Sequence, residues 1–236
     1  MRAYVRLIGA AAALALLASC GQKPASSELA EPAPLPPYGE EEENPEVFLD
    51  SMEVGSRELY AARDAVLAAA NIPAGARVAD IGAGTGLYSL LFANAVGAGG
   101  VIYAVDIEPR FLKLIGQRAA DLDIGNVVAV LGRETDITLP PSSVDVVFIA
   151  DTYHYFTDRA AIMQTVKDAL TPGGRLIILD YTLEETHKDD ARRAHVRFGK
   201  AGLINEVESF GFKLLEQPAV EGLSDIYMAV FEKAAS

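Results

Sequence analysis

Residues 78–93, VADIGAGTGLYSLLFA, constrain the fold of this chain more than any other stretch. An apolar run ends in Asp80, and three glycines follow at alternate positions, Gly82, Gly84 and Gly86. A strand that turns at once into a helix needs positive φ angles and no obstructing side chains, and glycine supplies both. The pattern therefore predicts a strand, a tight loop and a helix, with free loop N–H groups at the helix N-terminus that suit a negative group.

From residue 46 onward, stretches typical of strands alternate with stretches of helical spacing. Such alternation predicts a parallel sheet with helices on both faces. The almost continuous apolar character of residues 127–131, 144–150 and 175–180 predicts strands buried on both faces. The last two strands follow each other closely, so they must be antiparallel.

The fold class predicted is therefore α/β: a doubly wound, mostly parallel, seven-stranded Rossmann-like sheet with an antiparallel C-terminal strand pair. The expected strands are 76–82, 101–107, 126–132, 144–151, 173–181, 212–218 and 226–234. The expected helices are 46–70, 85–97, 109–123, 158–170 and, as one helix or two, 191–211.

A second acid, Asp106, ends the strand that follows the glycine loop. In open α/β sheets an acid at this place accepts hydrogen bonds from ribose hydroxyls. The dinucleotide fingerprint G-x-G-x-x-G is not met, because Leu87 and Ser89 occupy the positions where its last glycine would stand. The loop instead has the form D-x-G-x-G-x-G over residues 80–86.

This motif, together with Asp106, resembles the first motif of class I S-adenosylmethionine-dependent methyltransferases. Residues 139–156 and 170–181 are similar to the fourth strand and to the segment that leads into the fifth strand of these enzymes. Within the class, MEVGSRELY at 52–60 and HVRFGK at 195–200 resemble a poorly characterised bacterial subgroup. The resemblance implies S-adenosylmethionine as cofactor and methyl transfer to an unknown small-molecule acceptor.

The resemblance also implies which residues bind the cofactor. The glycine loop would approach the methionine part, the acid that opens the motif would lie near its amino group, and the second acid would hold the ribose. An acid after the third strand would lie near adenine, but the match is ambiguous by two residues within the stretch from Arg133 to Asp136. Asp151 would touch the amino group of the methionine part. The implied cofactor-binding residues are Asp80, Gly82, Ala83, Gly84, Gly86, Asp106, Ile107, Glu134 and Asp151.

The loop after the fourth expected strand, residues 151–156, is the expected place for catalysis because ligands bind at the carboxyl edge of such sheets. A base is needed only if the acceptor arrives protonated. We predict His154 as general base, with Tyr153 beside it; alternatively these aromatic residues wall the pocket or pack under a helix. No metal site is expected, because the three histidines lie in separate segments without close acids.

The N-terminus predicts a lipoprotein-type signal peptide over residues 1–19. Arg2 and Arg6 precede an apolar run of a dozen residues, too short to span a bilayer. The sequence Leu-Ala-Ser-Cys then resembles the bacterial lipobox, with Cys20 as the lipidation site; an ordinary cleaved signal is the alternative. Residues 20–45, rich in Pro and Glu, predict a disordered tether, and 46–236 the methyltransferase domain.

These features predict a lipid-anchored protein of the cell envelope that faces the periplasm, with the outer membrane as the expected destination and the cytoplasm as the alternative. The net charge of −13 argues against nucleic acid as a partner. A local basic cluster at 187–200 suits a solvated face, an anionic acceptor or lipid head groups. The oligomeric state is left open by the sequence.

Two other functions stay open at this stage. One is a non-catalytic envelope lipoprotein that uses the fold to bind a nucleoside-like ligand or a protein partner. The other is a different enzyme on the same fold, such as an aminopropyl transferase. The intact motif at residues 80–86 argues against decay of the cofactor site, and so against the first of these.

Overall fold

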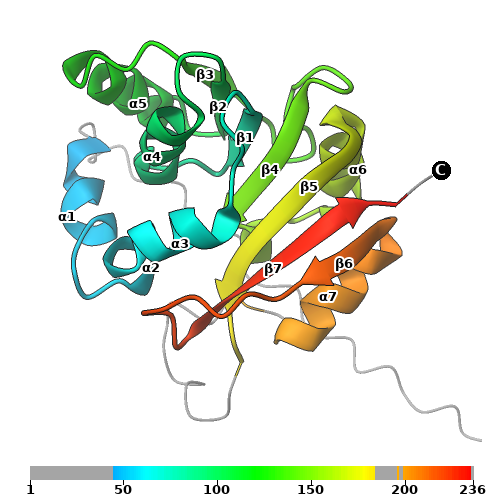
Figure 1. Cartoon of the computed structure of the whole chain (residues 1–236). Helices are drawn as coiled ribbons and strands as arrows, with labels where there is room; N and C mark the ends of the chain where they lie inside the picture. The colour runs from blue at the N-terminus through cyan, green and yellow to red at the C-terminus, as the bar shows by residue number, and fades with distance from the viewer. Residues whose placement is uncertain (1–44, 184–195, 197–198, 235–236) are drawn as a thin grey trace, which may run out of the picture. The chain divides into compact units, whose positions relative to one another are not determined.

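A computed structural model describes residues 45–183, 196 and 199–234 of the chain. Its seven strands form one sheet in the order β3-β2-β1-β4-β5-β7-β6. The first five run parallel, and β7 is antiparallel to both β5 and β6, so the predicted sheet is confirmed (Figure 1). The strands are β1 Arg77–Ile81, β2 Val101–Asp106, β3 Val127–Leu131, β4 Val144–Ala150, β5 Leu170–Tyr181, β6 Phe212–Glu216 and β7 Ile226–Lys233.

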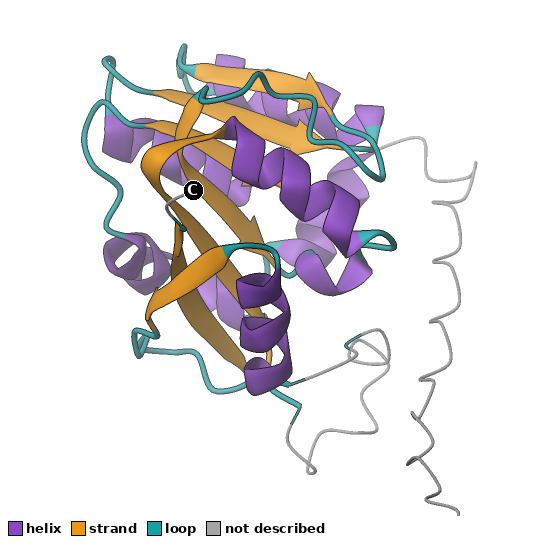
Figure 2. Cartoon of the chain, turned by 90° about the vertical axis from the view of Figure 1, so that its right-hand side faces the viewer, coloured by secondary structure: helices purple, strands orange, loops and turns teal. Residues whose placement is uncertain are grey.

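Helices cover both faces of this sheet (Figure 2). The described helices are η1 Pro45–Phe48, α1 Leu49–Met52, α2 Glu58–Ala61, α3 Arg63–Ala70, α4 Leu87–Val96, α5 Pro109–Asp121, η2 Tyr153–Tyr155, α6 Arg159–Ala169 and α7 Lys200–Ser209. None of them is long and apolar enough to cross a bilayer.

The core has two layers, one on each face of the sheet. Successive side chains of a strand point to opposite faces. Val147 and Ile149 of β4 therefore pack with α6 and α7, whereas Val146 and Phe148 pack with α3 and α4. The apolar strands thus hold a rigid sheet whose carboxyl edge carries the loops described below.

The predicted helix at 46–70 is wrong as a single element. The chain there forms four short helices. η1 and α1 precede a turn over residues 53–57, and α2 and α3 follow it. Helical propensity is a weak preference that tertiary contacts override. Here Glu53 forms an ion pair with Arg118 of α5, and Arg57 forms one with Asp151, so the turn is held by partners outside the segment.

The predicted burial of residues 127–131 on both faces is also wrong. They form β3, which lies at one edge of the sheet beside β2 alone. Val128 is 44% exposed and Leu131 is 54% exposed. An apolar run cannot reveal whether its strand is central or at an edge, because either place suits β-branched residues.

The expected helix at 191–211 is represented by α7 alone, and its earlier part lies outside the described residues, as do Cys20, the expected signal and tether, and His187 and His195.

Candidate active site

The glycine loop joins β1 to α4 at the carboxyl edge of the sheet. Gly82, Gly84 and Gly86 all have positive φ, at 70°, 53° and 83°. The N–H groups of Gly82 and Ala83 donate to the carbonyl oxygen of Val105, and that of Gly86 donates to the carbonyl oxygen of Ala83.

The N–H of Gly84 donates to a side chain, the Oδ2 atom of Asp106, at 2.9 Å. Four loop N–H groups are therefore bonded within the protein. These four groups therefore do not face a negative ligand, and a negative group at the remaining N–H groups of the first turn of α4 stays a prediction.

The three glycines of the loop have different surroundings. A Cβ atom at Gly82 would overlap the side chain of Thr152, and one at Gly86 would lie 2.7 Å from Ile115. A Cβ at Gly84 would meet nothing nearer than the sulfur of Met52, at 3.8 Å. Gly82 and Gly86 thus permit close packing within the protein, whereas a Cβ at Gly84 would fit at an ordinary van der Waals distance from Met52.

Three buried or partly buried carboxyl groups surround this loop. Burial raises the pKa of Asp80 to about 7, although Oδ2 accepts a 2.6 Å hydrogen bond from Ser89 that opposes the shift. Burial also raises the pKa of Asp106, whose Oδ1 accepts from the N–H of Glu108 at 2.9 Å. The pKa of Asp151 is likewise raised by burial, while the Arg57 guanidinium opposes that shift. This concentration of carboxyl groups suits a positively charged ligand.

The other residues expected to bind the cofactor lie around the same edge. Ile107 is 59% exposed directly after β2. Glu134 is exposed on a turn closed by Arg133 and Asp136. This turn joins the site through Gly132, whose N–H donates to the carbonyl oxygen of Asp106. The structure thus gathers the expected residues at one edge, and the role of each in binding stays a prediction.

The N-terminal segment contributes two contacts that the sequence analysis missed. Arg57 pairs with Oδ2 of Asp151. Glu53 pairs with Arg118, which also donates to the carbonyl oxygen of Thr85 in the glycine loop at 2.7 Å. Both Glu53 and Arg57 lie in the stretch MEVGSRELY that carries the subgroup resemblance, so this stretch was the signal available in the sequence.

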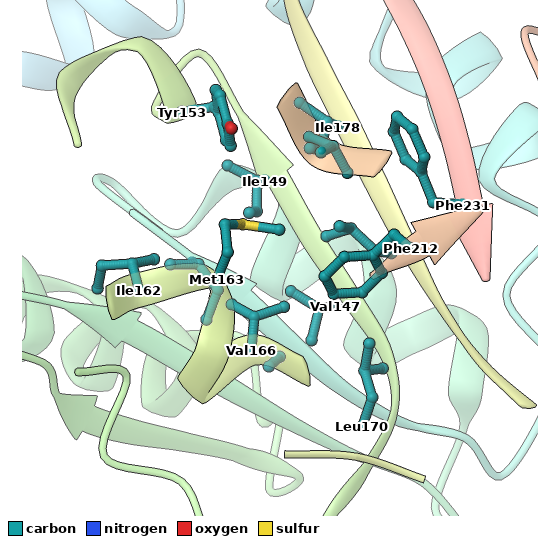
Figure 3. Close-up of a cluster of buried hydrophobic side chains, with 14 of the residues drawn as sticks. Val147, Ile149, Tyr153, Ile162, Met163, Val166, Leu170, Ile178, Phe212 and Phe231 are labelled. Carbon is teal, nitrogen blue, oxygen red and sulfur yellow. The ribbon is translucent and has the colours of Figure 1, made fainter. Parts of the chain in front are cut away.

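The two residues predicted for catalysis have different environments. Tyr153 lies in the core with Ile149 and Met163, and its hydroxyl donates to Glu206 at 2.6 Å (Figure 3). This placement favours the packing alternative for Tyr153. His154 is also buried, but its Nδ1 atom lies 2.9 Å from Oδ1 of Asp180, and its Nε2 atom has no hydrogen-bond partner among the described residues.

Asp180 was missed as a site residue. It lies near the end of β5 as the single acid in the apolar run RLIILDY, and that interruption was the signal in the sequence.

A cavity of about 230 Å³ lies beside the β6–β7 connection. Val220 and Leu223 of the β6–β7 connection line it, together with Lys200 and Tyr227. Tyr227 pairs with Asp180 in the β5–β7 ladder, which joins the cavity to the His154 neighbourhood. The Lys200 ammonium lies 5.9 Å from the centre of the Tyr227 ring. A cavity lined by both polar and apolar side chains, among them one cation and one tyrosine, suits a small organic molecule.

A family model described as a methyltransferase domain matches residues 72–234. The chain belongs to this methyltransferase family. The matched range runs from the end of α3 through β7, and so it contains the glycine loop, Asp106 and the loop after β4.

Known proteins that resemble this methyltransferase have related descriptions. The ubiquinone/menaquinone biosynthesis C-methyltransferase UbiE of Methylococcus capsulatus is 27% identical over 198 residues, which cover 80% of this chain and 77% of that protein. Matches to UbiE proteins of other bacteria cover between 43% and 58% of those proteins. The chain therefore spans about half the length of most of these relatives.

Solved structures share the fold. A SAM-dependent methyltransferase from Aquifex aeolicus matches with a TM-score of 0.70 and 23% identity, over 81% of this chain and 99% of that one. A possible exported protein from Bordetella parapertussis matches with a TM-score of 0.60 and 16% identity, over 74% of this chain and 67% of that one.

S-adenosylmethionine is the cofactor of this methyltransferase. The residues fit that group, because its sulfonium and ammonium cations would lie near the carboxyl groups of Asp80, Asp106 and Asp151.

Proposed function

We propose that the chain transfers the methyl group of S-adenosylmethionine to a small acceptor that carries an ionisable proton. The observation that carries the proposal is the glycine loop at the carboxyl edge of the sheet, where the carboxyl group of Asp106 holds the N–H of Gly84 and those of Asp80 and Asp151 lie close by. When bound, S-adenosylmethionine supplies a methyl group already activated on sulfur. The protein then has to position the acceptor, exclude water and accept a proton.

In this proposal each residue around the loop has a defined task. Asp106 accepts hydrogen bonds from the ribose hydroxyls while it holds the N–H of Gly84. Asp151, which pairs with Arg57, faces the ammonium, and Asp80 holds the first turns of α4 through its hydrogen bond with Ser89. Ile107 and Glu134 border the adenine. Because these groups come from β1, β2, β4 and the turn after β3, the sheet itself fixes their spacing.

We propose a phenolic or quinol-type ring as the acceptor class. Support comes from the relatives, which are named as C-methyltransferases of ubiquinone and menaquinone biosynthesis. The cavity lined by Tyr227 and by the Lys200 cation suits an aromatic ring that becomes anionic when it loses its proton. Loss of that proton is what makes an oxygen or a ring carbon nucleophilic toward a methyl group.

Calorimetry of the full chain with S-adenosylmethionine and S-adenosylhomocysteine tests the proposal. We expect binding with a Kd of about 1 μM, which corresponds to about 8 kcal/mol. Transfer of labelled methyl groups to a panel of phenols, thiols and amines then identifies the acceptor class. If neither cofactor form produces heat at high micromolar protein, methyl transfer is refuted and a non-catalytic scaffold becomes the better interpretation.

We further propose that residues 1–19 are cleaved as a lipoprotein signal, that Cys20 carries the lipid, and that residues 20–45 tether the domain 46–236 to the outer membrane on its periplasmic side. The arginines, short apolar run and single cysteine of the N-terminus support this proposal. The resemblance in fold to a possible exported protein is in line with it. A cytoplasmic location is the alternative.

A further inference from the structure

We infer that Asp180 is a positioning residue that fixes the tautomer of His154, so that the Nε2 atom of His154 can accept the acceptor's proton. The inference rests on the proposed function and extends it to a residue outside the cofactor loop. It concerns two side chains from separate elements, η2 and β5, that the fold brings together in the core.

The contact between these residues is short and shielded from water. Nδ1 of His154 lies 2.9 Å from Oδ1 of Asp180, and both side chains are 2% exposed. Oδ1 also accepts a 2.7 Å hydrogen bond from the N–H of Tyr181, which holds the carboxyl group in place. A carboxylate can only accept, so the proton of a neutral imidazole must lie on Nδ1. The lone pair is then on Nε2.

The Nε2 atom faces the cofactor edge of the sheet. It lies 4.0 Å from Oδ1 of Asp151, the oxygen that Arg57 leaves free. Asp151 is followed by Thr152, whose side chain packs against Gly82 of the glycine loop. The rings of Tyr155 and Tyr181 lie beside the imidazole, with centroids at 4.0 and 5.9 Å. The imidazole is therefore enclosed by aromatic rings, and its Nε2 atom lies on the side of Asp151, at the carboxyl edge of the sheet.

A purely structural role explains this arrangement less well. A histidine retained for packing and ion pairing alone would bond both of its ring nitrogens within the protein, because a buried polar atom without a partner lowers stability. In the described part of the chain, three atoms at this place lack partners: Nε2 of His154, Oδ2 of Asp180 and the hydroxyl of Tyr227, which stands across from Asp180. The missing contact of Nε2 is the one that a ligand would supply.

The chemical step balances without any further reactant. The acceptor's O–H, N–H or S–H proton passes to Nε2, which makes His154 an imidazolium with both N–H groups bonded. A bond forms between the acceptor and the methyl carbon as the bond from sulfur to that carbon breaks, and the electron pair stays on sulfur. For methylation at carbon of a phenol, the imidazolium returns its proton to the ring oxygen, and Nε2 then takes the proton from the methylated carbon, which restores aromaticity. The Asp180 carboxylate stabilises the imidazolium in the meantime.

Two substitutions of Asp180 separate positioning from simple charge. In Asp180→Asn, the Tyr181 N–H keeps the amide oxygen at the Oδ1 place, so the oxygen still accepts from Nδ1–H. Asp180→Leu has a similar size but accepts no hydrogen bond. Asp145→Leu is the matched control, because it removes a carboxylate bonded to Arg77 near the start of β4, at the opposite edge of the sheet.

The test reads the tautomer directly by imidazole 1H–15N NMR of the full chain at about pH 8.5, where the unperturbed imidazole is neutral. The His154 signals are assigned by their loss in His154→Gln. We expect the proton on Nδ1 in the wild type, in Asp180→Asn and in Asp145→Leu, and a shift toward Nε2–H in Asp180→Leu. We expect kcat to fall about 100-fold or more in Asp180→Leu and less than about 10-fold in Asp180→Asn, with the Kd of S-adenosylmethionine changed less than about twofold.

A wild-type proton on Nε2 would overturn the inference, and this result needs no variant to fold. So would an Asp180→Leu protein that keeps both the wild-type tautomer and the wild-type kcat. Failure of the proposed function looks different: the wild type binds no S-adenosylmethionine, while the NMR spectrum still decides whether Asp180 positions His154.

Discussion

Gly84 is the residue at which cofactor binding and folding can be separated. Its φ of 53° strains any other residue, yet an added Cβ meets no protein atom within 3.7 Å, since Met52 is 3.8 Å away. We expect Gly84→Ala to lower the free energy of unfolding by only about 1–2 kcal/mol. We expect it to weaken S-adenosylmethionine binding at least about 30-fold, because the methyl occupies cofactor space. Calorimetry and urea unfolding measure the two effects.

The control for Gly84→Ala is Gly116→Ala in α5, where an added Cβ meets nothing within 4 Å. In a helix interior this change should raise stability by up to about 1 kcal/mol and leave binding unchanged. Normal cofactor affinity in Gly84→Ala would show that the ligand does not approach the loop at this point.

Asp80 gives the stability of the domain a specific pH dependence. Its pKa in the folded protein is about 7, whereas an unfolded aspartate stays near 3.8. Between these values the folded state holds a proton that the unfolded state has lost, so the contribution of Asp80 is full below about pH 4 and declines as the pH rises toward 7. The slope is at most about 1.4 kcal/mol per pH unit.

Asp80→Asn should remove this slope. We expect the variant to lose less stability than the wild type between pH 5 and pH 8 in urea unfolding, although Asp106 and Asp151 contribute slopes of the same sign in both proteins. Parallel stability curves for the two proteins would mean that Asp80 is already ionised in the fold.

The N-terminal segment depends on ion pairs rather than on helix length. Arg57 and Asp151 have side chains that are 22% and 18% exposed, so their pair is only partly screened by water. Arg57→Gln leaves Asp151 without its guanidinium and should lower the free energy of unfolding by about 1–3 kcal/mol. Urea unfolding measures the loss. Arg63→Gln in α3, where Arg63 donates to the Tyr60 carbonyl and stacks on its ring, should cost less. If both variants lost the same free energy of unfolding, the removed positive charge, and not the contact with Asp151, would explain the effect of Arg57→Gln.

Elements were predictable where a local pattern determines them. The glycine loop, the alternating units and the antiparallel β6–β7 pair follow from spacing along the chain, and the structure confirms them. The turn at 53–57 was not predictable in this way, because its cause is a contact between Arg57 and Asp151, 94 residues apart. Asp180 was missed for the same reason, since 26 residues separate it from His154. Pairings across the sheet edge leave no periodic signal.

The whole molecule raises the question of where the reaction occurs. If Cys20 is lipidated, cleavage removes Arg2 and Arg6 and no acid, and the net charge changes from −13 to −15. Two or more acyl chains anchor a protein stably, whereas one does not. We expect labelled fatty acid to enter the full chain expressed in a bacterial host and not to enter Cys20→Ala, which should become soluble. A mature protein that retains Met1 and fractionates with the cytoplasm would instead support the cytoplasmic alternative.

The hydrogen bonding of the glycine loop has a consequence for competition among adenosine compounds. ATP shares its adenine and ribose with S-adenosylmethionine, so Asp106 alone cannot tell them apart. Charge can distinguish the two compounds. The loop N–H groups of Gly82, Ala83, Gly84 and Gly86 are bonded within the protein and cannot bind phosphates, and buried carboxyl groups near the loop would repel them. An abundant nucleotide should therefore be a poor inhibitor, and the enzyme could work at donor concentrations far below those of ATP.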